Sequence, residues 1–197
     1  MRACLLWLAF CLIFAIAGCS KPETARAPTS PQLANAPEAG QGATNVIDAC
    51  SLLTSKEIEA IQGAALKDTK PSANSQGGLA VSQCYFLLPS AADSIVLTVT
   101  QRAAGSNSRD PKESWDEMFH GNKENASTRE EGEKESVGPQ MIISLGDEAF
   151  WAPQRFGGAM YALKGNIYIS ISVGGPGDQP TKIQKSKALA EIVLKRL

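Results

Sequence analysis

The chain has very little histidine and no excess of positive charge. It has one histidine in 197 residues, and its 19 Lys and Arg are balanced by 20 Asp and Glu, which leaves a formal net charge of −1. This balance excludes a strongly basic nucleic-acid surface. The scarcity of histidine also leaves little room for catalysis or metal binding, which rely heavily on that side chain. The sequence therefore says more about location and fold than about an activity.

The N-terminus has the pattern of an export signal. Arg2 is followed by an unbroken apolar run over residues 3–17, which is shorter than the roughly 20 residues a helix needs to cross a bilayer. A charged start, a short apolar core and then small residues are typical of a secretory signal peptide. We predict a signal peptide over residues 1–18, with a membrane-spanning anchor as the alternative.

The end of that run resembles the lipobox of bacterial lipoproteins, in which an aliphatic residue and two small residues precede a cysteine; here it is Ile16-Ala17-Gly18-Cys19. In that family the thiol receives a diacylglycerol, the signal is cut before the cysteine, and the new amine is commonly acylated. The resemblance implies lipidation at Cys19 and an anchor of two or three chains, each buried methylene contributing about 0.8 kcal/mol. Ser20 in place of Asp favours the outer membrane over the inner membrane in a diderm bacterium, and the same motif implies the cell membrane in a monoderm.

Residues 19–45 have the composition of a tether. Aliphatic residues are nearly absent after Ser20, while proline recurs at positions 22, 28, 31 and 37. Such a segment cannot bury enough apolar surface to offset the entropy lost on ordering. We predict a lipidated N-terminus and disordered tether over 19–45, and a single domain over 46–197, a comfortable size for one core.

Cysteine usage supports export. Cys4 and Cys11 would leave with the signal peptide and Cys19 would carry lipid, so Cys50 and Cys84 remain in the domain. In an oxidising compartment such a pair is expected to form a disulfide. A metal site or a redox centre is the alternative, although a Cys-x-x-Cys spacing and a nearby histidine are both missing.

The domain alternates between helix and strand patterns. Thr54 and Glu57 form a capping-box pattern and Gly63 a stop signal, which predict a helix over 55–62. Further helices are predicted from Pro111 and at the C-terminus, and a loop with a short strand over 64–79. Clear strands are predicted over 81–88, 94–101, 158–163 and 166–173. This order predicts an α+β domain, with a mainly antiparallel sheet, short helices packed on one face and one disulfide.

Two of these strands should have distinct faces. In the strand over 94–101, period-two alternation predicts one face with Ile95, Leu97 and Val99 and another with Val96, Thr98 and Thr100. In the strand over 166–173, one side carries Ile167, Ile169, Ile171 and Val173, and the other carries Tyr168, Ser170 and Ser172.

Three short segments resemble a class of small bacterial lipoproteins of unknown function. They are Asp-Ala-Cys-Ser-Leu-Leu-Thr at 48–54, Cys84 followed by an aromatic residue, and Leu-Gly-Asp-Glu-Ala-Phe-Trp at 145–151. The resemblance implies an envelope location, an α+β domain and a helix-to-strand disulfide. It implies no reaction.

His120 and two carboxylates are the candidates for catalysis. A Ser-His-Asp site would need His120, with Asp116 one turn earlier as its orienting partner. No serine shows the pattern of a nucleophile elbow, so we expect a solvated histidine at a helix end. Asp147 and Glu148 could form an acid/base pair, but adjacent strand residues point to opposite faces. We expect Asp147 to serve the turn after Gly146 instead.

Two further segments could bind ions. The loop over 174–177 precedes a helix and could hold an anion, but it lacks a Gly-Lys-Ser/Thr ending and Pro176 removes an amide donor. A turn is the simpler prediction. An acidic segment could bind calcium, but its spacing matches no EF-hand loop, so a solvated charged face is expected. Its carboxylates are Glu130, Glu131, Glu133 and Glu135.

Aromatic side chains could line a pocket for a hydrophobic ligand, although such residues more often belong to the core. They are Trp115, Phe119, Phe150, Trp151, Phe156 and Tyr161.

Together these patterns predict a membrane-anchored lipoprotein whose non-catalytic domain binds an envelope partner. The alternative is a carrier for a lipid or other apolar ligand, held on the concave side of the sheet. An enzyme would need a convergent polar cluster in a cleft. We predict no cofactor, no metal and no nucleic-acid partner.

Overall fold

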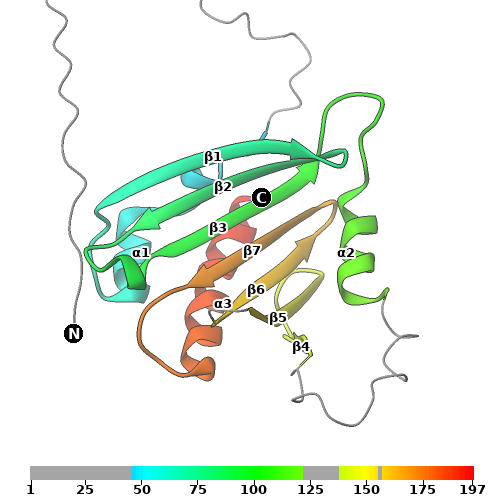
Figure 1. Cartoon of the computed structure of the whole chain (residues 1–197). Helices are drawn as coiled ribbons and strands as arrows, with labels where there is room; N and C mark the ends of the chain where they lie inside the picture. Colours follow the sequence, from blue (N-terminus) through cyan, green and yellow to red (C-terminus); the bar gives the residue numbers. More distant parts are fainter. Residues whose placement is uncertain (1–45, 122–137, 155–156) are drawn as a thin grey trace, which may run out of the picture. The chain divides into compact units, whose positions relative to one another are not determined.

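The computed structural model describes residues 46–121, 138–154 and 157–197. Short 3-10 helices are labelled η. The elements, in chain order (Figure 1), are η1 (Ala49–Leu52), α1 (Ser55–Gln62), β1 (Asp68–Gln76), β2 (Leu79–Leu87), η2 (Ala91–Asp93), β3 (Ile95–Arg102), α2 (Pro111–Phe119), β4 (Gln140–Met141), β5 (Glu148–Gln154), β6 (Gly157–Lys164), β7 (Ile167–Val173) and α3 (Gln179–Arg196).

The described strands form one seven-stranded sheet in the order β1-β2-β3-β7-β6-β5-β4. Every neighbouring pair is antiparallel. The centre is the pairing of β3 with β7, in which Leu97 lies opposite Ile171 and Thr98 opposite Ser170. The predicted α+β class with an antiparallel sheet is confirmed.

One face of the sheet is covered by η1, α1 and α3, which lie behind the strands in Figure 1. Ile95, Leu97 and Val99 of β3 are completely buried on this side, as are Ile169 and Ile171 of β7. The predicted alternation of both strands is therefore confirmed. The last helix contributes further core residues, namely Leu189, Ala190, Val193 and Leu194. We call this the covered face.

A disulfide links η1 to the sheet. The sulfur atoms of Cys50, in η1, and Cys84, in β2, lie 2.03 Å apart, with a Cα–Cα distance of 4.9 Å. The predicted helix-to-strand bridge is confirmed, and the thiols are not free to form a metal or redox site. Cys84 is completely buried, so the bridge lies within the core of the covered face.

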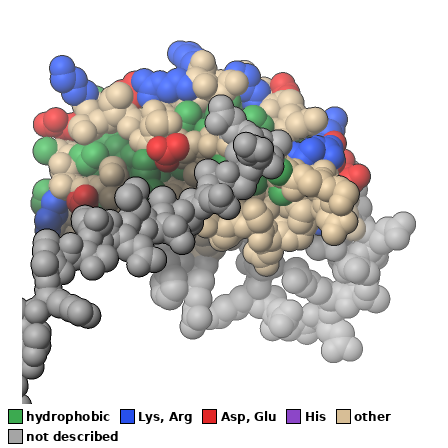
Figure 2. Space-filling model, turned by 90° about the horizontal axis from the view of Figure 1, so that it is seen from above, with side chains coloured by type: hydrophobic (Ala, Val, Ile, Leu, Met, Phe, Trp, Pro, Cys, Tyr) green, Lys and Arg blue, Asp and Glu red, His purple; other side chains and the backbone are tan. Residues whose placement is uncertain are grey.

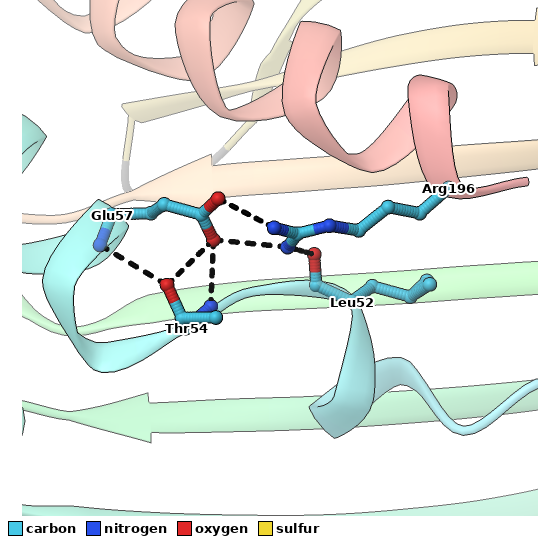
Figure 3. Close-up of polar contacts among 4 residues, drawn as sticks. All are labelled: Leu52, Thr54, Glu57 and Arg196. Carbon is cyan, nitrogen blue, oxygen red and sulfur yellow. Dashed lines mark hydrogen bonds and ion pairs between the residues drawn. The ribbon is translucent and has the colours of Figure 1, made fainter.

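The first and last helices are joined by an ion pair at the C-terminus (Figure 3). Arg196 donates to both oxygens of Glu57, at 2.5 and 2.9 Å, and to the carbonyl of Leu52 at 2.6 Å. Glu57 also completes the predicted capping box, because it accepts from the backbone and hydroxyl of Thr54 at 2.8 Å each. The hydrogen bonds from Arg196 contribute most to lowering the pKa of Glu57 to about 2.

Two elements differ from the sequence-based predictions. The short strand predicted within the loop over 64–79 is longer than expected: β1 is an edge strand of nine residues that pairs with β2 along its length. In the view onto this edge (Figure 2), hydrophobic side chains form a band, with most of the visible Lys and Arg along one border and a few Asp and Glu nearby. α2 packs on the face opposite to α3, because Trp115 contacts Phe150, Leu163 and Tyr168 there. Met118, three residues after Trp115, is 42% exposed.

Candidate binding site on the open face of the sheet

The face opposite to α3 carries a cavity of about 620 Å³. We call this side the open face; it is turned toward the viewer in Figure 1. α2 covers only its end, where the aromatic cluster lies. The floor of the cavity comes from three neighbouring strands of the sheet. Its floor residues are Gln83 and Tyr85 of β2, Val96 and Thr98 of β3, and Ser170 and Ser172 of β7.

Polar side chains form a continuous row across these strands. The register places Gln83 opposite Thr98, Thr98 opposite Ser170, and Ser170 opposite Tyr161 of β6. Cross-strand neighbours have Cβ atoms roughly 4.5–5.5 Å apart, so the row offers hydrogen-bonding groups at regular short intervals. Gln83 Nε2 donates to the Thr98 hydroxyl at 3.1 Å, and Gln154 Nε2 donates to the Tyr161 hydroxyl at 3.0 Å. The amide groups at both ends of the row are thereby oriented.

A wall closes one end of the cavity. It consists of the segment around η2 and the loop that follows β7, held together by two backbone hydrogen bonds. Gly174 N donates to Ser94 O at 3.0 Å, and Gly175 N donates to Ala92 O at 2.6 Å. A Cβ atom at Gly174 would lie 2.0 Å from the carbonyl oxygen of Ala92. Only glycine permits this close approach, so the wall is tightly built.

The cavity has no charged lining residue among those the structure describes, although 20% of the chain is charged. Its polar groups are hydroxyls and amides, which both donate and accept hydrogen bonds. Lys70 lies opposite Tyr85 on the edge strand β1, but it does not line the cavity. The arrangement can therefore bind a neutral ligand by hydrogen bonds.

The second cluster of interest lies beneath α2. The carboxylate of Glu148 accepts from the buried indole of Trp115 at 2.6 Å and lies 3.0 Å from His120 Nε2. Partial burial raises the pKa of Glu148, but the hydrogen bonds from Trp115 and His120 outweigh it, so the pKa lies below its usual value. An ionised Glu148 thus attaches the end of α2 to β5.

The side chain of His120 is not oriented by Asp116, the partner that a Ser-His-Asp site would have needed. Its ring contacts Glu148, which lies 28 residues away, whereas its contact with Asp116 is a backbone hydrogen bond between His120 N and Asp116 O. The side chain of His120 is 38% exposed. Sequence spacing finds partners one helical turn apart, and it contains no signal for a contact between a helix end and a distant strand.

Asp147 and Glu148 point to different places, as predicted. Asp147 accepts from the backbone of Gly165 at 2.6 Å, and therefore holds the turn between β6 and β7. Gly146 has a φ of 63°, and a Cβ there would lie 2.3 Å from Leu163 O. The Leu-Gly-Asp segment thus has a structural role in joining β5 to the adjacent hairpin.

Most of the candidate aromatic residues belong to the core. Phe119 and Phe150 stack with ring centroids 4.5 Å apart, and Phe119 meets Tyr161 at 5.4 Å. Trp115 joins this cluster, whereas Trp151 is buried on the covered face. Phe156 lies outside the described residues.

Two candidate ion-binding segments and the predicted lipidation site remain to be placed. The loop over 174–177 is a turn before α3, whose N-terminus is capped by Asp178 through Thr181 N at 3.0 Å. The predicted lipidation site Cys19 and the acidic residues Glu130, Glu131, Glu133 and Glu135 lie outside the described residues. Within the described ranges, no group of three or more His, Cys, Asp or Glu could hold a metal ion. No helix in that part of the chain has the length and hydropathy of a membrane span.

A second groove of about 450 Å³ lies beside β4. Met141 and Ile143 line it, and they are 61% and 77% exposed. Its rim carries charged groups, including Lys112 and Asp116 of α2. This groove therefore differs in chemistry from the neutral cavity on the open face.

Comparison with protein-family models, with curated proteins and with solved structures finds no match for this chain. The resemblance to small lipoproteins thus stays a prediction. Sequence analysis assigned Thr98, Ser170 and Ser172 to the correct side of the sheet but gave them no role. The available signal was that this side carries hydroxyl groups where an ordinary solvent-facing strand would often carry charge.

Proposed function

We propose that the chain is a lipid-anchored envelope protein whose domain binds another envelope component, without catalysis, through the open face. The observation that carries the proposal is the cavity of about 620 Å³ on a sheet face that α2 covers only at its end. Three central strands present side chains there that do not serve the main core.

The proposed location rests on the N-terminal sequence and on the cysteines. Arg2, the apolar run over 3–17 and the Cys19 motif are typical of an exported lipoprotein. A disulfide such as Cys50–Cys84 is typical of oxidising compartments. Together they favour an exported, lipid-anchored domain, and Ser20 after the motif favours the outer membrane, with the domain in the periplasm or at the cell surface.

Binding is favoured over catalysis by the separation of the groups. His120, the single histidine, contacts Glu148 beneath α2 and does not line the open-face cavity. The cavity itself presents hydroxyl and amide groups, which recognise a ligand but are weak acids and bases near neutral pH.

A Cys19→Ala variant tests the anchor. We expect the native chain to sediment with membranes and to incorporate a labelled fatty acid. The variant should lose the label and appear in the soluble fraction, because the acyl chains would supply the membrane affinity. Sedimentation of the variant with membranes to the same extent as the native chain would refute the lipoprotein proposal.

A bulky residue on the open face tests the binding surface. We expect Ser170→Trp to fill part of the cavity and to abolish crosslinking of the membrane-bound chain to its partner. Ser75→Trp is the matched control, because Ser75 is exposed on the edge strand β1 and does not line the cavity. Equal crosslinking of both variants would exclude the open face as the interface.

A carrier for an apolar ligand is the second candidate, and the groove beside β4 is the observation that favours it. Exposed Met141 and Ile143 offer apolar contact there, whereas an apolar ligand on the open face would leave the hydroxyls of Ser170 and Ser172 without partners. Native mass spectrometry separates the two candidates: a lipid that copurifies with the native chain and is lost in Met141→Ser/Ile143→Ser supports the carrier.

A further inference from the structure

We infer that the open-face cavity binds a neutral polyhydroxylated ligand, a saccharide, by hydrogen bonds to its row of hydroxyl and amide side chains. This inference rests on the proposed function and specifies the chemistry of the component bound there. It follows from which hydrogen-bonding groups the floor offers, from their lack of charge, and from the fixed shape of the walls.

The floor of the cavity can be recognised only through side chains. β2 pairs with β1 and β3, β3 with β2 and β7, and β7 with β3 and β6, so each floor strand is hydrogen-bonded to a neighbour on both sides over most of its length. An extended peptide, which binds best by pairing with free backbone groups at a sheet edge, gains no such bonds on this floor. A ligand that carries its own dense set of donors and acceptors is a better match.

The row from Gln83 through Thr98 to Ser170 supplies that match. Each hydroxyl donates one hydrogen bond and accepts others, as the hydroxyls of a sugar do. Ser170 and Ser172 are only partly buried, and within the described residues their hydroxyls make no hydrogen bond to another protein group. Their hydroxyls are therefore available to a ligand.

Charge complementarity selects a neutral ligand. No Lys or Arg among the described lining residues is present to neutralise a phosphate, sulfate or carboxylate, and no Asp or Glu to hold a cation. Desolvating an unpaired charge on this surface would be unfavourable. A nucleotide, an anionic polymer and a metal ion are thereby disfavoured.

Tyr85 supplies an apolar contact beside the hydroxyl row. It lies opposite Val96, and Val96 lies opposite Ser172, so an aromatic and an aliphatic side chain adjoin the polar groups. A pyranose has a similar division, with C–H groups on its faces and hydroxyls at its edge. Tyrosine suits this division because it combines an apolar ring with a polar tip.

The end wall adds preorganisation. Gly174 and Gly175 donate to Ser94 and Ala92, so the wall does not need to be ordered by the ligand. Side chains that are already held lose less entropy on binding, and the amide of Gln83 is held in this way by Thr98.

Titration of the full chain with neutral oligosaccharides tests the inference. The chain is purified in a detergent without a sugar headgroup and titrated with maltotetraose, cellotetraose and N-acetylchitotetraose, with dextran sulfate and hexadecanoate as charged and apolar comparisons. We expect at least one neutral oligosaccharide to bind. The Thr98→Val/Ser170→Ala variant should bind it about tenfold more weakly, because two hydrogen bonds are removed with little change in shape.

Ser75→Ala is the matched control and should bind as the native chain does, and thermal unfolding checks that all variants are folded. Equal affinity of the native chain and the double variant would overturn the inference, as would the absence of binding to all three oligosaccharides at millimolar concentration or binding of dextran sulfate or hexadecanoate alone. If the saccharides fail but Ser170→Trp still abolishes crosslinking to an envelope partner, the ligand class is wrong and the proposed function stands.

Discussion

The two faces of the sheet use neighbouring residues for different purposes. On β3, Leu97 is completely buried against the helices, whereas Thr98, the next residue, lies on the floor of the cavity. On β7, Ile171 and Ser172 divide in the same way. The alternation of a strand thus lets one segment stabilise the fold and carry a candidate binding surface at once.

The connections that fix η1 and α1 belong to the covered face. The Cys50–Cys84 disulfide attaches η1 to β2, and the Glu57–Arg196 ion pair attaches α1 to α3. On the open face, the floor residues have hydrogen bonds such as that from Gln83 to Thr98, but α3 and the other helices behind the sheet do not reach them. Changes on the covered face should therefore affect stability, and changes on the open face should affect binding.

Removal of the disulfide should have the largest effect on stability. A Cys50→Ala/Cys84→Ala variant frees a loop with a sequence separation of 34, and the chain-entropy relation gives a loss of about 3–4 kcal/mol. Urea unfolding of the oxidised native chain and of the variant measures the difference. A loss well below 1 kcal/mol would show that the core holds η1 in place without the bridge.

A pair of adjacent substitutions compares the faces directly. Leu97→Ala should lower the free energy of unfolding by about 3 kcal/mol, because it leaves a cavity in the core. Thr98→Val keeps the side-chain shape on the open face and should change it by less than about 0.5 kcal/mol. Denaturant unfolding of both variants provides the measurement, and similar losses would contradict the division between the faces.

Sequence patterns predicted those parts of the fold that are fixed by neighbouring residues. The helix over Ser55–Gln62 was predicted at its observed bounds because Thr54, Glu57 and Gly63 form local signals at both ends. The length of β1 was underestimated because Lys70, Pro71 and the polar residues after them are exposed and show no apolar alternation. An edge strand of this kind is stabilised by backbone pairing with β2, which no local pattern reveals.

The candidate site was less accessible from sequence than the core. Gln83, Thr98 and Ser170 come from three separate strands, and only the register of the sheet places them in one row. The position of α2 on the sheet also depends on contacts between residues that are far apart in the chain. The spacing of Trp115 and Phe119 predicts an apolar side, but their partners Phe150 and Tyr168 are distant in the chain.

The Glu57–Arg196 ion pair should contribute a smaller, pH-dependent share of stability. The pKa of Glu57 is lowered from 4.5 to about 2 in the folded chain. The contribution is therefore fully present above about pH 4.5 and is lost as the pH falls through about 2. Because both side chains are partly solvated, we expect about 1–2 kcal/mol at neutral pH.

Arg196→Gln tests this contribution, with Lys195→Gln as the control at an exposed neighbouring position. Arg196→Gln should destabilise the chain at pH 7 and have much less effect at pH 2, whereas Lys195→Gln should have little effect at either pH. Unfolding measured as a function of pH checks both. A loss for Arg196→Gln that does not depend on pH would show that its hydrogen bond to Leu52 O dominates.

Hydroxyl groups on the two sides of the sheet provide the most sensitive comparison. Ser186 of α3 is completely buried, and its hydroxyl has no hydrogen-bond partner in the described structure. Ser186→Ala removes an unsatisfied polar group and improves helix propensity, so it should raise the free energy of unfolding by about 1 kcal/mol. Ser170→Ala, on the open face, removes a hydroxyl that water can reach and should leave stability nearly unchanged.

Because Ser170 is also in the proposed saccharide row, thermal unfolding and oligosaccharide titration of the two variants should give opposite results. Ser186→Ala should change the melting temperature alone, and Ser170→Ala should change affinity alone. A stabilised Ser170→Ala variant would show that the open face is not the solvated binding surface described above.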